Sequence, residues 1–115
     1  MDATSTREIQ IRQLEKTAVQ VPTEEEFNEL MHVLHMGNCH WIDGNSLISP
    51  DNNYWNCHRD DTCVTTEPSK KLGILHVMYA SKYSCEEVGY NVISLEDFYR
   101  EQGITPQEIE EIGNI

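Results

Sequence analysis

One capped helix that leads directly into a strand constrains the fold more than any other part of this 115-residue chain. Thr23 and Glu26 form a capping-box pattern just after Pro22, which predicts a helix that begins at residue 24. Gly37 supplies the left-handed residue that commonly ends a helix, so we predict a helix over residues 24–36. Its apolar residues recur at the spacing of a single helix face. They are Phe27, Leu30, Met31 and Leu34.

Short apolar segments predict a sheet on which this helix packs. Alternating apolar residues predict a strand at 17–21, and Cys39-His40-Trp41-Ile42 predicts another directly after the helix. The segments 62–66 and 90–94 predict two more short strands. Residues 72–80 are apolar on both alternating faces, which indicates a strand in the middle of the sheet. Cys39, Trp41 and Cys63 are expected in the core.

The C-terminal third predicts further helices. A helical turn is expected over 81–87, Ser94 with Asp97 begins a helix that ends at Gly103, and Thr105 with Glu108 forms a second capping box. The order of elements predicts an α+β fold, with a mostly antiparallel sheet of four or five strands and two or three helices packed on one face.

The length predicts one domain. We expect residues 1–16 to form an N-terminal arm, residues 17–103 to form a single α+β domain, and residues 104–115 to form a short acidic C-terminal helix. No apolar run is long enough to span a membrane, and acidic residues interrupt the first twenty where a signal peptide needs an apolar centre. We therefore expect a cytoplasmic protein that does not interact with membranes.

The net charge of −12 lies in two blocks of the sequence. Residues 21–44 contain five acids and no Lys or Arg, and residues 86–115 contain eight acids against Arg100 alone. Such a field repels nucleic acid and attracts basic protein surfaces. A direct nucleic-acid binder is therefore disfavoured and a basic protein partner is favoured, although acidic helix faces also serve solubility alone.

Seven short segments together resemble small uncharacterised accessory proteins of tailed bacteriophages and prophages. They are Val21-Pro22-Thr23, Glu24–Gly37, Trp41-Ile42-Asp43-Gly44, Asn53-Tyr54-Trp55, Asp61-Thr62-Cys63-Val64, Lys70-Lys71-Leu72 and Gly89–Tyr99. The resemblance covers roughly residues 17–100 and brings no catalytic residues with it. It implies a protein expressed in the bacterial host cytoplasm, where small acidic proteins often inhibit host enzymes or host defence.

The leading functional hypothesis is a non-enzymatic inhibitor or adaptor that binds a host defence or nucleic-acid-handling protein through acidic surfaces. If the basic surface of that partner normally holds DNA, carboxylates would stand in for phosphates and the chain would act as a DNA mimic. Tyr54 and Trp55, in a long polar loop over residues 43–61, are expected to form either a lid over the core or an apolar binding anchor. The predicted partner-binding residues are Tyr54, Trp55, Glu86, Glu87, Glu101, Glu108, Glu110 and Glu111.

The alternative is a small zinc- or thiol-dependent binding module. Zinc prefers thiolate and imidazole ligands, but the close cysteine pair typical of structural zinc sites is missing. The candidate ligands are Cys39, Cys57, His58 and Cys63. The sequence has no glycine-rich phosphate loop and no recognisable nucleophile motif, so we expect no enzymatic activity and no cofactor. A phage structural or assembly protein is a further alternative.

Overall fold

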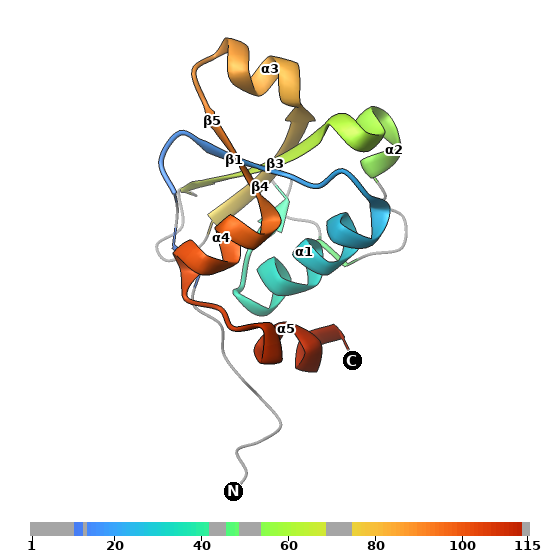
Figure 1. Ribbon diagram of the computed structural model, residues 1–115, viewed down its shortest axis with the longest axis vertical. Coiled ribbons are helices and arrows are strands. Elements are labelled where there is room, and N and C mark those ends of the chain that lie inside the picture. The colour runs from blue at the N-terminus through green and yellow to red at the C-terminus, as the bar shows by residue number, and fades with distance from the viewer. Residues whose placement is uncertain (1–10, 13, 42–45, 49–53, 69–74, 114–115) are drawn as a thin grey trace, which may run out of the picture.

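A five-stranded sheet carries the fold, with the strand order β2-β4-β3-β1-β5. The computed structural model describes residues 11–12, 14–41, 46–48, 54–68 and 75–113 (Figure 1). The strands are β1 (Thr17–Gln20), β2 (His40–Trp41), β3 (Thr62–Pro68), β4 (Leu75–Ser81) and β5 (Asn91–Ser94). The helices are α1 (Glu24–Met36), α2 (Trp55–His58), α3 (Lys82–Glu87), α4 (Leu95–Gln102) and α5 (Pro106–Gly113), with a short 3-10 helix at Arg59–Asp61. The α+β class is thereby confirmed.

The sheet is mixed, so the prediction of a mostly antiparallel sheet is wrong. The central pairs β1–β3 and β3–β4 are antiparallel, but the outer pairs β1–β5 and β2–β4 are parallel. Each outer strand follows a helix rather than a hairpin, because α1 leads into β2 and α3 leads into β5. A helical connection returns the chain to the end of the sheet where the previous strand began, so the next strand runs in the same direction.

The ends of α1 follow local chemistry. The Glu26 amide donates to the Thr23 hydroxyl over 3.1 Å, so the predicted start is confirmed. Gly37 is not left-handed (φ −87°), and Asn38 takes that conformation instead (φ 65°). The amides of Asn38 and Cys39 donate to the carbonyls of His35 and Leu34, both over 3.0 Å, which is the Schellman pattern with Asn38 as its left-handed residue.

Helices α4 and α5 begin as the sequence predicts, and α4 also ends as predicted. The Asp97 amide donates to the Ser94 hydroxyl over 3.1 Å, and Gly103 ends α4 in the left-handed region (φ 73°). At α5 the capping box is reciprocal: the Glu108 amide donates to the Thr105 hydroxyl, and the Thr105 amide donates to the Glu108 carboxylate. The turn between the two helices is therefore held at both ends.

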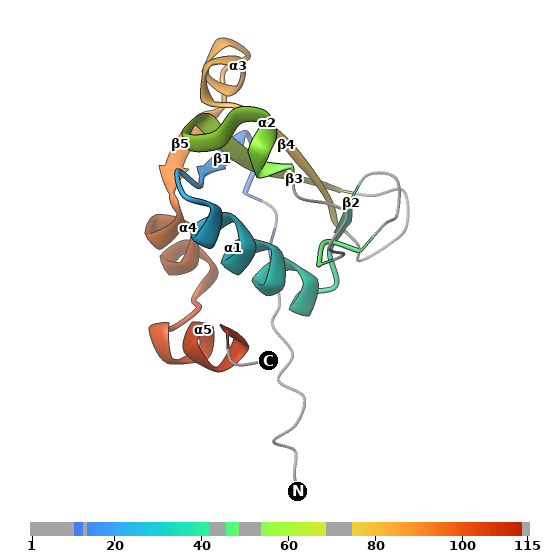
Figure 2. The same cartoon turned by 90° about the vertical axis from the view of Figure 1, so that its right-hand side faces the viewer.

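Helices α1 and α4 pack on one face of the sheet and enclose the main core, and α5 lies outside them (Figure 2). Helix α3 lies at the opposite end of the molecule and buries Cys85 against Ala18 and Cys63 on the other sheet face. The predicted packing of helices on one face therefore holds for α1 and α4, whereas α3, expected only as a helical turn, packs on the other face. The reason is that the side chains of Ala18 and Cys63 point away from α1, because strand residues alternate between faces.

Two strand and loop predictions also need correction. Strand β4 lies between β2 and β3, but only one of its faces meets the main core, and Met78 on the other face is 41% exposed. Part of the segment expected to be loop is helical, at α2 and the 3-10 helix after it. A helix of four residues is too short to show apolar periodicity. Residues 42–45 and 49–53 of that segment and 69–74 before β4 lie outside the described residues.

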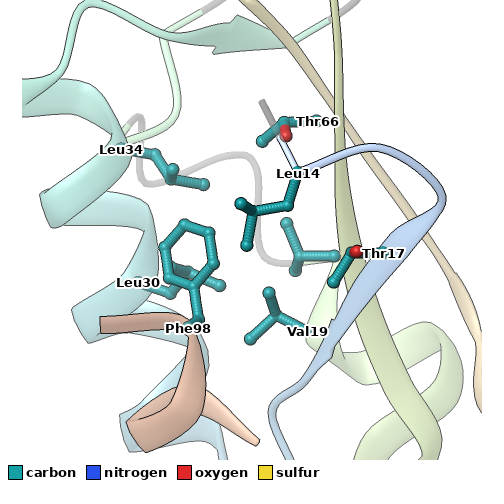
Figure 3. Close-up of a pocket in the computed structure, with 8 residues that line it drawn as sticks. Leu14, Thr17, Val19, Leu30, Leu34, Thr66 and Phe98 are labelled. Atoms are coloured by element: carbon teal, nitrogen blue, oxygen red, sulfur yellow. The ribbon is translucent and has the colours of Figure 1, made fainter. Parts of the chain in front are cut away.

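The residues just before β1 close the main core. Leu14 points between α1 and the sheet, toward Leu30 and Phe98, and leaves a residual cavity of only about 10 Å³ (Figure 3). The Arg12 backbone amide donates to the side-chain oxygen of Gln102 over 2.8 Å, and the side-chain amide of Gln102 donates to the Arg12 carbonyl over 2.7 Å. The Arg12 guanidinium also donates to the Glu101 carbonyl over 2.6 Å. This segment is therefore fixed to the C-terminal end of α4.

Candidate partner-binding groove

Residues of α1, α4 and α5 line a groove of about 750 Å³. Figure 2 shows α5 beside α1 and α4 on the side away from the sheet. Helix α1 contributes two glutamates, α4 contributes charged and aromatic side chains, and the turn into α5 contributes apolar side chains. Its lining includes Glu26, Glu29, Leu95, Glu96, Tyr99, Arg100, Ile104, Thr105, Pro106 and Ile109. The two acidic blocks of the sequence therefore meet at one surface of the folded protein. We call this surface the acidic groove.

The floor of the acidic groove is apolar. Leu95 and Ile104 are 4% and 8% exposed, and Ile109 is half-buried against the main core. The Ile104 amide donates to the Tyr99 carbonyl over 2.9 Å, directly after the left-handed Gly103. The sharp turn between α4 and α5 therefore holds apolar side chains beneath a charged rim.

One wall presents two carboxylates that neighbouring hydroxyls hold. Glu26 and Glu29 lie three residues apart on α1 and so share a helix face. The Thr23 hydroxyl donates to Glu26 over 3.1 Å, and the Tyr99 hydroxyl donates to Glu29 over 2.9 Å. Burial, followed by the nearby Glu29 charge, raises the pKa of Tyr99 above its ordinary value. Tyr99 is therefore protonated at neutral pH and remains a donor to Glu29.

The opposite rim is partly neutralised. Arg100 contacts Asp97 at 2.8 Å and Glu96 at 3.3 Å, within the same helix. Its side chain is 67% exposed, and exposed pairs of this kind contribute only about 0–1 kcal/mol to stability. Arg100 is the only Lys or Arg among the described residues that line the groove. The excess negative charge therefore lies on the α1 wall.

Some of the predicted partner-binding residues lie on the helices that form the groove, but none of them is among its described lining residues. Glu101 is exposed at the end of α4, Glu110 is exposed on α5, and Glu108 is half-buried in its capping box. Glu111 belongs to α5, but its side chain lies outside the described residues. The prediction missed Glu26, Glu29 and Glu96. For Glu29 a signal existed, because it lies beyond the first turn of α1, where the helix dipole does not explain an acid.

Glu86 and Glu87 are exposed on α3, at the far end of the molecule from the acidic groove (Figure 1). Tyr83 and Val88, on and directly after the same helix, are 69% and 66% exposed. The predicted acidic residues therefore lie on two separate parts of the molecule, on α4 and α5 beside the groove and on α3 far from it. We call the second one, formed by Tyr83, Glu86, Glu87 and Val88, the α3 surface.

Tyr54 and Trp55 are packed rather than free. Tyr54 stacks on Tyr79 with ring centroids 4.7 Å apart and meets the edge of Trp41 at 5.0 Å. The Trp55 indole donates to the Val21 carbonyl over 3.1 Å. The lid alternative describes this packing, whereas an anchoring role for these half-buried rings stays a prediction.

The candidate metal ligands lie on separate elements. Cys39 follows α1, Cys57 and His58 belong to α2, and Cys63 lies in β3. Burial raises the pKa of both Cys39 and Cys63 to about 12, so both thiols are protonated at neutral pH. Cys57 is exposed, with its thiol 3.8 Å from the Tyr79 hydroxyl. Within the described part of the chain, no three His, Cys, Asp or Glu residues are grouped to hold a metal ion.

The fold and the site define a small α+β protein with a mixed five-stranded sheet and an acidic groove between three helices. No family model, curated protein or solved structure matches the chain. Among the described residues, no helix is long and apolar enough to cross a membrane.

Proposed function

We propose that this chain is a non-enzymatic inhibitor or adaptor that binds a basic surface of a partner protein with its acidic groove. One observation carries the proposal. Acids that are distant in the sequence, from α1 and α4, line one groove in which Arg100, already paired with Glu96 and Asp97, is the one base among the described lining residues. Each contributes a charge that attracts a basic surface from beyond contact distance, because the Debye length is about 8 Å at physiological salt.

The groove also provides apolar contacts, which make binding more specific than charge alone does. A diffuse acidic surface attracts any basic protein, whereas an apolar floor at Leu95, Ile104 and Ile109 adds burial that depends on shape. Complementary charge mainly raises the association rate, and apolar contacts at the centre of an interface mainly slow dissociation. The combination suits a specific complex.

The phage resemblance gives this proposal a context. In a phage-infected cell, the partner is a bacterial defence or nucleic-acid-handling protein in the host cytoplasm, and this chain inhibits or recruits that partner. The DNA-mimic form requires in addition that the carboxylates occupy the positions of DNA phosphates on the partner. Competition between DNA and this chain for the partner distinguishes that form from a simple adaptor.

Affinity capture from a bacterial lysate tests the proposal. Tagged protein is incubated with lysate, washed at low salt, eluted at high salt, and the eluate is identified by mass spectrometry. A triple variant Glu26→Gln, Glu29→Gln, Glu96→Gln removes charge from the groove, and the double variant Glu86→Gln, Glu87→Gln removes charge from the α3 surface.

We expect a basic protein that elutes with salt, is lost with the groove variant and is retained by the α3 variant. A partner that is indifferent to salt, or that is captured equally by the groove variant, would contradict the proposal. Both variants must first show the far-ultraviolet circular dichroism of the parent, so that unfolding is not mistaken for lost binding.

A further inference from the structure

We propose that the acidic groove recognises a short linear segment of the partner in which Lys or Arg stands beside an apolar side chain. This inference rests on the proposed function and specifies what the partner must present. It also gives the bound segment a direction: the cation faces Glu26 and Glu29 on α1, and the apolar side chain enters between α4 and α5.

The size of the groove fits a few side chains rather than a broad protein face. Its volume of about 750 Å³ lies within the range of roughly 300–1,000 Å³ that is typical of pockets for small ligands. The lining combines an apolar floor with a small number of polar groups, as such sites usually do. A linear segment of a partner reaches into such a groove more readily than a flat surface does.

The cation position follows from the hydrogen bonds behind the carboxylates. The nearly buried Tyr99 hydroxyl binds Oε2 of Glu29, and no hydrogen bond to Oε1 is found in the described ranges. The Thr23 hydroxyl likewise occupies Oε1 of Glu26. Both carboxylates are thus oriented before binding and retain acceptor capacity for a guanidinium or ammonium group.

The position of Arg100 sets the direction of the segment. On the α4 rim, the Arg100 guanidinium already contacts Glu96 and Asp97, so a second cation there would meet like charge. On the α1 wall, the described lining residues include no Lys or Arg. Charge complementarity therefore favours a cation against α1, which leaves the floor at Ile104 and Ile109 for the apolar neighbour.

Labelled synthetic peptides test the inference by fluorescence anisotropy. The first peptide places Arg and Leu at neighbouring positions, the second has the same charges with every Leu replaced by Ser, and the third keeps Leu but replaces Arg by Gln. The variants are Glu29→Gln and Tyr99→Phe. The control is Asp60→Asn, an equal loss of charge at an exposed residue after α2, outside the groove lining.

We expect the first peptide to bind about 10-fold more tightly than either of the others, because each of those lacks one of the two contacts. Glu29→Gln should weaken binding about 10-fold and Tyr99→Phe about 3-fold, since the carboxylate loses its charge or its orientation. The Asp60→Asn control should change binding by less than about 2-fold.

Equal binding of the Arg–Leu and Arg–Ser peptides, or equal losses for Glu29→Gln and Asp60→Asn, would overturn the inference and leave only diffuse charge attraction. Absence of binding by the Arg–Leu peptide would also overturn it. None of these results decides the proposed function, because the lysate capture with the groove variant tests that separately with an intact partner.

Discussion

The acidic groove and the α3 surface carry similar charge but differ in what lies beneath it. In the groove, Glu29 is oriented by Tyr99 over an apolar floor. On the α3 surface, Glu86 and Glu87 stand exposed beside exposed Tyr83 and Val88. Acidic residues in the sequence therefore do not by themselves mark a binding site, and the fold decides which of them are held in place above apolar surface.

The two sheet faces also differ in how much they bury. Helix α1 has 13 residues and buries five side chains in the main core, whereas α3 has six residues and buries only Cys85. The core on the α3 side is built on Ala18, Cys63 and Cys85. Stability should therefore depend mainly on the α1 side, and α3 should open more easily.

The largest expected effect contrasts the two cores. Phe27→Ala removes a ring that is 1% exposed in the main core and should lower the free energy of unfolding by about 3–5 kcal/mol. Cys85→Ala removes only a sulfur from the small cluster and should cost about 1 kcal/mol. Urea denaturation measures both. Similar losses for the two variants would show that the faces contribute equally to stability.

Thiol accessibility provides the second contrast. Cys57 is exposed, whereas Cys39, Cys63 and Cys85 are buried, and burial raises the pKa of each buried thiol. Iodoacetamide should therefore modify Cys57 first. Cys85 should follow about 100-fold more slowly through local opening of α3, since an opening free energy of about 3 kcal/mol suffices for that. Mass spectrometry of timed samples identifies each site, and modification of Cys39 before Cys85 would contradict the order of opening.

Removing the N-terminal caps of α5 and α3 should have smaller effects, and these should differ in whether peptide binding is lost. Thr105→Ala removes the capping box that holds the α4–α5 turn and should destabilise α5 by about 1 kcal/mol. Because α5 forms part of the groove, binding of the Arg–Leu peptide should weaken as well. Ser81→Ala removes the cap of α3, where the Ser84 amide donates to the Ser81 hydroxyl, and should leave peptide binding unchanged. Hydrogen exchange and anisotropy measure the two effects, and equal loss of peptide binding would contradict the separation.

The smallest effect appears at alkaline pH. The folded protein raises the pKa of Tyr99 above its ordinary value of 10.0, through burial and the Glu29 charge. Its contribution to stability is complete well below pH 10 and declines above it, because the unfolded chain then loses a proton that the folded chain keeps. At pH 10 the decline should be about 0.4 kcal/mol.

The two faces can be compared through the matched variants Tyr99→Phe and Tyr90→Phe. Tyr90 donates to Glu67 over 2.8 Å on the other sheet face, and this hydrogen bond raises its pKa with a smaller contribution from burial. Tyr99→Phe should flatten the alkaline decline more than Tyr90→Phe does. Denaturant melts between pH 8 and pH 10.5 give the comparison, and identical profiles for the two variants would refute it.

The local structure was predictable from the sequence because its causes are local. The starts of α1, α4 and α5 depend on Thr23, Ser94 and Thr105, each within three residues of the amide it caps. The left-handed residue after α1 was misplaced by one position, because Asn38 competes successfully with Gly37 for that conformation.

The sheet and the groove were not predictable in the same way, because they depend on long-range packing. The position of β5 at the edge of the sheet depends on its pairing with β1, which is distant in the sequence. The groove depends on the Tyr99–Glu29 hydrogen bond between α4 and α1, which are 70 residues apart at that contact. The packing of half-buried Leu14 toward Phe98 likewise brings together residues that are distant in the sequence, and no short-range pattern predicts it.

Chemical-shift mapping tests the central claim, that the acidic groove is the binding site, most directly. Isotope-labelled protein is titrated with the Arg–Leu peptide, and backbone amide signals are followed by nuclear magnetic resonance. We predict saturable shifts confined to the first turns of α1, to α4 and to the α4–α5 turn, with the α3 surface and α2 unchanged. Shifts centred on α3 or on Tyr54 and Trp55, or spread evenly over all acidic residues, would contradict the account.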